Sequence, residues 1–172
     1  MRLTGKIGID NEQALKAVIL LQMKPVVDYV VDEILESLKK NIDKHVYNSY
    51  SPVEGGYQRL GDDGGLRNLW ENKKSEIKDG KVIGTVKEEP ERLVTNADLF
   101  QHGSNYWERT DIRDLIAHIV IEGKSGDLFG EGEWRKPRDF WHPLIDKLDA
   151  GQVNKLIEKA FKKYKIKFVK IY

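Results

Sequence analysis

The sequence predicts an α+β fold, in which a long N-terminal helix and C-terminal helices pack on a small antiparallel sheet. Three observations predict it. Apolar residues recur at spacings of three and four between residues 14 and 46, an Asp79-Gly80 pair separates two extended segments, and a second helical pattern covers residues 152–164. The chain has 172 residues, 40% hydrophobic and 33% charged, which is enough for one core. We therefore expect residues 1–172 to form a single globular domain.

The long N-terminal helix is expected to begin after Asp10 or Asn11, since both residue types suit the N-cap position, and to end near Val46. Pro25 lacks a backbone N–H and crowds the preceding turn, so we expect the helix to be kinked or split there. Residues 1–10 are interpreted as a short edge strand or an extended N-terminal arm. The predicted apolar face consists of Ala14, Leu15, Val18, Leu21, Val27, Val31, Ile34, Leu38, Ile42 and Val46.

The central part of the chain indicates a small sheet. An Asp-Gly pair between extended segments is a strong hairpin signal, and the arm at residues 81–86 is richer in β-formers than the arm before it. A further short strand is expected at residues 92–95. Residues 115–121 suit either a helix or a buried strand. Asp111 as a possible N-cap and an acidic first turn favour a short helix that ends at Gly123.

The C-terminal part indicates helices followed by a strand. Residues 123–137 contain four glycines and few apolar side chains, which predicts a mobile loop. Residues 138–148 and 152–164 have helical patterns and are separated by Gly151. The period-two alternation at residues 165–168, which residues 169–172 continue imperfectly, predicts a final strand that closes the sheet.

The sequence gives little support for catalysis. The absence of cysteine excludes disulfides, thiolate metal sites and thiol nucleophiles, and it suits a reducing cytoplasm. The four histidines show no metal-ligand spacing, and no serine lies in a G-x-S-x-G context. Gly123-Lys124-Ser125 resembles the end of a phosphate-binding loop, but His118 stands where that loop needs glycine. We therefore expect a protein that is not an enzyme and has no catalytic residues, metal or cofactor.

A small metal-dependent nuclease remains an alternative, because such enzymes need carboxylates that converge on a cation. Three acidic clusters could supply them: Asp62 with Asp63, Glu88 with Glu89, and Asp111 with Asp114. Carboxylates on loops and helix starts are, however, ordinarily hydration and capping groups.

Charge is distributed unevenly along the chain. Residues 151–172 carry seven lysines and only Glu158 as an acid, which gives +6, whereas residues 1–150 carry −5. This basic end is interpreted as a solvated helix face, a charged subunit joint or a nucleic-acid contact. A nucleic-acid-binding protein that uses the Lys-rich C-terminal helix and strand is therefore the first alternative function. Phe161, Tyr164 and Phe168 lie among the lysines, but their spacing suits a core better than base stacking.

No membrane partner is expected. The polar N-terminal segment lacks the pattern of a signal peptide. The most apolar run, residues 18–21, is too short to cross a bilayer.

Ordered landmarks along residues 45–145 resemble the tail-component, or tail-completion, family of long-tailed phages and related prophages. Each motif is weak alone, and their order is what makes the resemblance specific. The landmarks are Tyr47-Asn48-Ser49-Tyr50-Ser51-Pro52, Tyr57-Gln58-Arg59, Gly64-Gly65-Leu66, Val94-Thr95-Asn96, Ile121-Glu122-Gly123, Pro137-Arg138-Asp139-Phe140 and Pro143. The chain departs from the pattern in having Ile-Glu-Gly without the usual extra residue and Arg-Asp-Phe in place of Arg-Pro-Phe. Residues 97–110 also look longer than the usual connection.

The resemblance implies a structural virion protein of the head–tail interface (the neck), made in the bacterial host cytoplasm. It would form a homo-oligomeric ring of six or twelve copies that joins the head connector or adaptor to the tail tube or tail terminator. A contact with passing DNA is left open. The residues expected at the subunit or partner interface are Tyr50, Pro52, Tyr57, Arg59, Gly64, Gly65, Leu66, Arg138 and Phe140.

Overall fold

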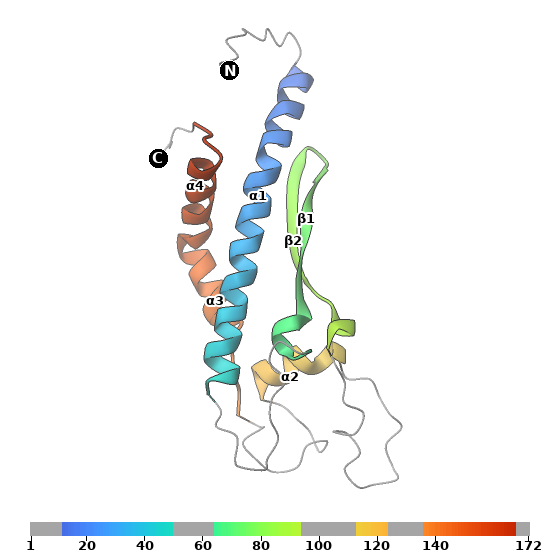
Figure 1. Ribbon diagram of the computed structural model, residues 1–172, viewed down its shortest axis with the longest axis vertical. Helices are drawn as coiled ribbons and strands as arrows, with labels where there is room; N and C mark the ends of the chain where they lie inside the picture. Colours follow the sequence, from blue (N-terminus) through green and yellow to red (C-terminus); the bar gives the residue numbers. More distant parts are fainter. Residues whose placement is uncertain (1–11, 50–63, 94–112, 124–135, 168–172) are drawn as a thin grey trace.

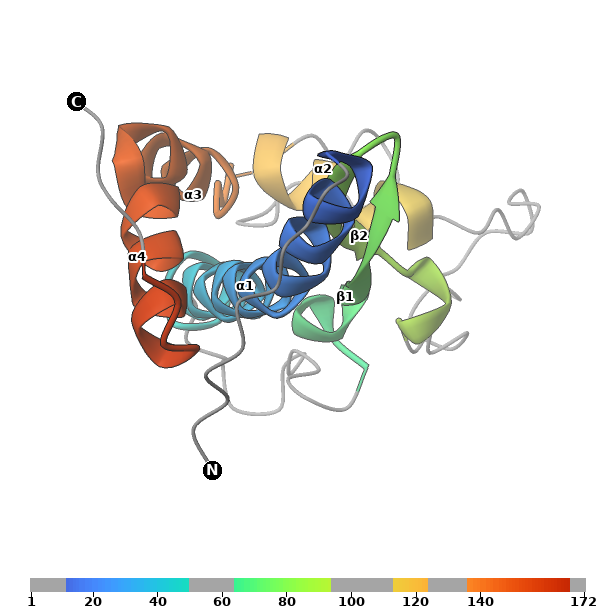
Figure 2. The same cartoon turned by 90° about the horizontal axis from the view of Figure 1, so that it is seen from above.

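The computed structural model describes residues 12–49, 64–93, 113–123 and 136–167. It confirms the α+β class, with mostly helix. Helix α1 (Glu12–Ile42) forms the long axis, and the hairpin of β1 (Trp70–Lys78) and β2 (Lys81–Glu88) lies along one side of it. Helices α3 (His142–Lys147) and α4 (Val153–Lys163) lie along the other side, and the short α2 (Ile116–Glu122) crosses near the base (Figure 1). Figure 2 shows α1 between α4 and the hairpin.

Helix α1 continues without a break through Pro25 for 31 residues and then closes with a π-helical turn at Asp43–Tyr47. Of the two expected outcomes at Pro25, a kink or a split, the split is therefore wrong. The hairpin supports the helix on either side of the proline: the Ser75 backbone N–H donates to Asp28 Oδ1 at 2.7 Å, and Ser75 Oγ donates to the Lys24 carbonyl at 3.3 Å. These bonds stabilise the turn in which proline removes one backbone donor.

The buried face of α1 differs from the predicted one. Its buried apolar residues begin at Val26 and include Val30 and Leu35, which the predicted face omitted. Leu15, Val18 and Leu21 are exposed, although the periodicity placed them on the buried face. The N-terminal third of α1 therefore lies largely outside the core that the described residues form.

The hairpin forms as Asp79-Gly80 predicted. Asp79 has φ 52° and Gly80 has φ 69°, and two positive φ values in a two-residue turn match the twist of the flanking strands. The register pairs Trp70 with Glu88 and Lys78 with Lys81, with an irregularity between Lys73 and Glu76. The two strands form the whole sheet within the residues described.

Two other predictions about the sheet fail. Arg92 lies in a 3₁₀ turn (Pro90–Arg92) and not in a strand, while residues 94 and 95 lie outside the described residues. The expected final strand is absent over residues 165–167, because Lys165 adopts φ 57° and turns the chain as soon as α4 ends. Residue 168 lies outside the described range, as do the expected arm at 1–10 and nearly all of the expected loop at 123–137.

The expected short helix ends where predicted, since Gly123 closes α2 with φ 69°. Gly151, with φ 92°, separates α3 from α4 within a π-helical turn (Leu148–Gln152). Helix α3 begins at His142 and not at residue 138. Asp139 accepts the first free backbone N–H groups, and Pro143 fits the first turn, so the helix starts there.

The core gathers where the base of α1 meets α2, α3 and the start of β1. Trp70 lies at its centre, in edge-on contact with Phe140 at 6.4 Å and stacked on Trp141 at 5.2 Å between ring centroids. Both tryptophans thus serve local packing. The buried cluster consists of Leu35, Leu38, Ile42, Val46, Leu66, Leu69, Trp70, Leu93, Ala117, Phe140 and Leu144.

Candidate docking surfaces

The two ends of the segment 50–63 are held together. Arg67, in the 3₁₀ turn Leu66–Leu69, pairs through Nη2 with Asp43 Oδ1 and places its guanidinium 5.3 Å from the centroid of the Tyr47 ring. On the helix side, Ser49 Oγ donates to the His45 carbonyl at 2.7 Å. The chain therefore leaves the described structure after Ser49 and re-enters it at Gly64 close to the same place.

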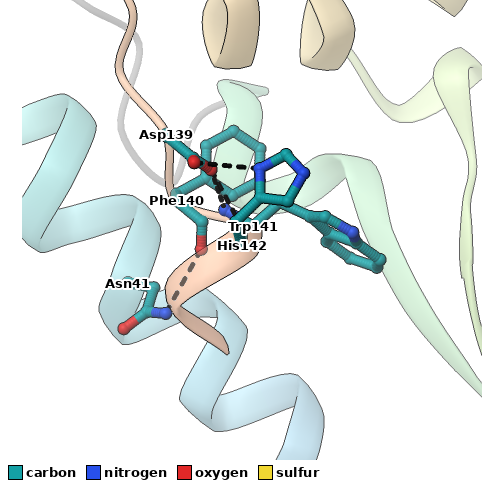
Figure 3. Close-up of polar contacts among 5 residues, drawn as sticks. All are labelled: Asn41, Asp139, Phe140, Trp141 and His142. Atoms are coloured by element: carbon teal, nitrogen blue, oxygen red, sulfur yellow. Dashed lines mark hydrogen bonds and ion pairs between the residues drawn. The ribbon is translucent and has the colours of Figure 1, made fainter. Parts of the chain in front are cut away.

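A second polar node joins α1 to the start of α3 (Figure 3). Asn41 is buried and donates through Nδ2 to the Phe140 carbonyl at 3.2 Å. Asp139 Oδ1 accepts the backbone N–H groups of Trp141 and His142, each at 3.0 Å, and Oδ2 lies 2.9 Å from His142 Nδ1. Burial acts to raise the pKa of Asp139, but the hydrogen bonds from His142 and Trp141 hold it below its usual range.

The predicted interface residues fall into three groups. Gly64, with φ 93°, and Gly65 lead the chain into the 3₁₀ turn, where Leu66 is buried. Phe140 is fully buried in the same core as Leu66, whereas Arg138 donates its backbone N–H to the Val120 carbonyl at 2.9 Å. The structure thus brings Leu66 and Phe140 together beneath the surface. The remaining predicted residues, Tyr50, Pro52, Tyr57 and Arg59, lie outside the described residues.

An exposed apolar surface at the free end of α1 was not predicted from the sequence. Its helical members are strongly exposed, with relative accessibilities of 47% for Leu15, 43% for Val18, 50% for Ile19 and 61% for Leu21. The far half of the hairpin adds Ile77 and Ile83, both exposed. We call these six residues the apolar tip. The signal was available in the sequence, since residues 17–21 are five consecutive apolar residues and cover every side of a helix.

The hairpin and α1 reach the apolar tip together. A Cβ on Gly80 would lie 3.0 Å from Lys16 Nζ, which places the hairpin turn beside the first turns of α1. Farther down, a Cβ on Gly84 would lie 2.4 Å from Val31 Cγ2 and 2.7 Å from Val27 Cγ1. Glycine at position 84 therefore allows strand β2 to lie directly against the helix.

Two of the predicted acidic clusters meet at an open pocket of about 330 Å³, lined by Glu89, Pro90, Glu91, Arg113 and Asp114. Burial raises the pKa of the neighbouring Glu88, and the charge of Asp114 adds to that rise. Over the described part of the chain, no group of three or more histidine, aspartate or glutamate side chains is arranged to hold a metal ion. Asp62, Asp63 and Asp111 lie outside that part.

No described helix is long and apolar enough to cross a membrane. The free end of α1 is apolar but short, and Lys16, Lys24 and Asp28 accompany it.

The model of a protein family described as YomN matches residues 11–166, which is most of the chain. No curated protein and no solved structure gives a match.

Proposed function

Because the chain belongs to the YomN family, a family of phage proteins associated with prophages, we propose that it is a structural virion protein of the head–tail interface. In this role, copies of the chain assemble into a ring that joins the head connector to the tail tube, and the protein catalyses no reaction. Family membership supports a phage protein. The ordered landmarks from Tyr47 to Pro143 support the more specific position at the neck.

The apolar tip is the observation that carries the proposal. Fully burying one leucine, isoleucine or valine side chain contributes roughly 1.5–3 kcal/mol, so a cluster of six half-exposed side chains is a strong driving force for association. Exposed apolar side chains gathered at one end of a molecule are typical of a protein–protein contact.

Other copies of the same chain are the occupants that we propose. The segment 17–21 is apolar on every side of the helix, whereas the hairpin approaches α1 from one side only. A helix that is apolar all round is stable when it is surrounded. In a closed ring every subunit has two neighbours, so both uncovered sides of the segment are buried by the same contact repeated around the ring.

The first experiment measures the mass of the purified protein in solution. Leu21→Glu places a charge in the proposed contact and should reduce the oligomer to monomer. Leu115→Glu is the matched control, because Leu115 is also an exposed leucine (52%) but lies on the 3₁₀ turn before α2, far along the molecule from the apolar tip. Dissociation of both variants alike, or a wild-type protein that is monomeric at every concentration, contradicts self-assembly through the tip.

The second experiment tests the position in the virion. Deleting the gene from an inducible prophage should yield filled heads and separate tails, and a copy carrying Leu115→Glu should restore joined particles while Leu21→Glu should not. Heads and tails that join normally without the protein would exclude the proposed role.

A further inference from the structure

Helix α4 carries a stripe of lysines beside its buried residues. Lys155, Lys159, Lys162 and Lys163 are spaced at i, i+4, i+7 and i+8, and all four are exposed. Leu156 and Ala160 are buried where α4 packs on α1 (Figure 2), and Lys163 borders this contact with its Nζ 4.4 Å from the centroid of the Tyr29 ring. With a rise of 1.5 Å per residue the stripe is about 12 Å long.

The stripe is not neutralised by the rest of the described chain. Between residues 151 and 167 there are six lysines and one acid, Glu158. Lys155, Lys159 and Lys162 make no ion pair with any residue that the structure describes. Elsewhere lysines do pair with acids, as Lys39 does with Glu36 at 3.7 Å and Lys87 with Glu89.

The spacing of the stripe places like charges next to one another in the isolated subunit. Like charges at i, i+4 destabilise a helix by about 0.2–0.5 kcal/mol per pair, and the stripe contains two such pairs, Lys155 with Lys159 and Lys159 with Lys163. The helix dipole stabilises cations only in the last turn, so it accounts for Lys162 and Lys163 but not for Lys155 and Lys159. A polyanionic partner would attract all four lysines and would reduce the repulsion between them.

We propose that the lysine stripe of α4 binds the backbone of double-stranded DNA without sequence preference. Residues 151–167 contain lysine but no arginine. Lysine is a hydrated point charge, and it binds phosphate groups without the fixed bidentate geometry of arginine, which suits contacts that do not depend on sequence. Duplex DNA carries one negative charge per roughly 1.7 Å of axis, so the length of the stripe faces several phosphates. The identification of this DNA as the phage genome that passes the neck rests on the proposed function.

The test is fluorescence anisotropy with a labelled mixed-sequence duplex of about 20 base pairs. Four phosphate contacts give a slope of about −3.6 for log K against log salt, so affinity should fall on the order of a hundred-fold between about 50 and 200 mM salt. Replacing Lys155, Lys159 and Lys162 together by glutamine should remove about 2.7 from that slope. The matched control replaces the exposed hairpin lysines Lys74, Lys78 and Lys81 by glutamine and should leave the slope unchanged.

Three results would overturn the inference: no DNA binding by the wild type at low salt, equal losses in the stripe and hairpin variants, or equally tight binding of a polyglutamate of matched charge. The last result would assign the stripe to an acidic protein. A melting temperature of the stripe variant at or above that of the wild type shows that it is folded. Its oligomeric mass should stay that of the wild type, so failure of DNA binding can be told apart from failure of ring assembly.

Discussion

Asn41 on α1 donates a buried hydrogen bond to the carbonyl of Phe140, 99 positions later in the chain. The distance from Asn41 Nδ2 to the carbonyl oxygen is 3.2 Å. This bond lies where the base of the long helix meets the turn into α3, beside the Trp70–Phe140 ring contact. It is the polar link between the first and last thirds of the described chain at the centre of the core, and it satisfies a carbonyl that water cannot reach.

Asn41→Ala should therefore lower the free energy of unfolding by about 1–3 kcal/mol, because the Phe140 carbonyl loses its donor in a buried site. Urea denaturation monitored by tryptophan fluorescence measures the change. Asn154→Ala, an exposed asparagine on α4, is the matched control and should be close to neutral. Equal effects of the two substitutions would mean that the buried hydrogen bond contributes nothing.

Gly84 should tolerate no side chain while Val31 keeps its full size. Gly84→Ala places a methyl 2.4 Å from Val31 Cγ2, so we expect a loss of about 1–3 kcal/mol of stability through overpacking. Adding Val31→Ala should restore part of that loss, although Val31→Ala alone destabilises the core. If the effects of the two substitutions simply add in a double-mutant cycle, the close approach of β2 to α1 is wrong.

The ionised carboxylate of Asp139 should contribute to the free energy of unfolding, and this contribution should be lost in acid. Its pKa is held below the usual range in the folded state, so the ionised carboxylate stabilises the fold above the unfolded pKa of about 3.9. That contribution is lost as pH falls through the lower, folded pKa. The difference in unfolding free energy between the wild type and Asp139→Asn should be constant above about pH 5 and shrink below it. A difference that persists unchanged to the lowest accessible pH would contradict this assignment. Glu88, whose pKa is raised, acts in the opposite sense and serves as a check through Glu88→Gln.

Replacing Arg67 by lysine should lower the stability of the protein. A lysine keeps the charge near Asp43 but cannot lie with a planar guanidinium over the Tyr47 ring, so Arg67→Lys should cost about 1 kcal/mol of stability. More tellingly, it should speed proteolytic cleavage between residues 50 and 63, because the ends of that segment are then less firmly joined. Arg92→Lys, which alters another partly exposed ion pair, is the control. Equal cleavage rates in the two variants would show that Arg67 does not hold these ends.

Elements with a strong local signal were predictable. The Asp79-Gly80 turn, the glycine end of α2 and the break at Gly151 each depend on backbone conformations that few residues adopt, so the sequence identifies them directly. The unbroken α1 was not predictable from Pro25 alone, because the hydrogen bonds from Ser75 that support it come from a hairpin 47 and 51 positions away.

The candidate site was predictable only in part. Leu66 and Phe140 were recognised as landmarks, but their burial depends on how Trp70 packs between distant segments. The apolar tip was missed because helical periodicity says which residues share a face and not whether anything covers that face. The lysine stripe, by contrast, was visible in the sequence as a charge imbalance, and only its freedom from ion pairs needed the structure.

The glycine at position 84 also has a mechanical consequence. Because residue 84 has no side chain, strand β2 packs directly against Val27 and Val31 of α1, and the hydrogen bond from the Ser75 backbone N–H to Asp28 joins the hairpin to the helix at a second place. We therefore expect the hairpin and the helix to move as one unit, from the turn at Gly80 down to the core around Trp70.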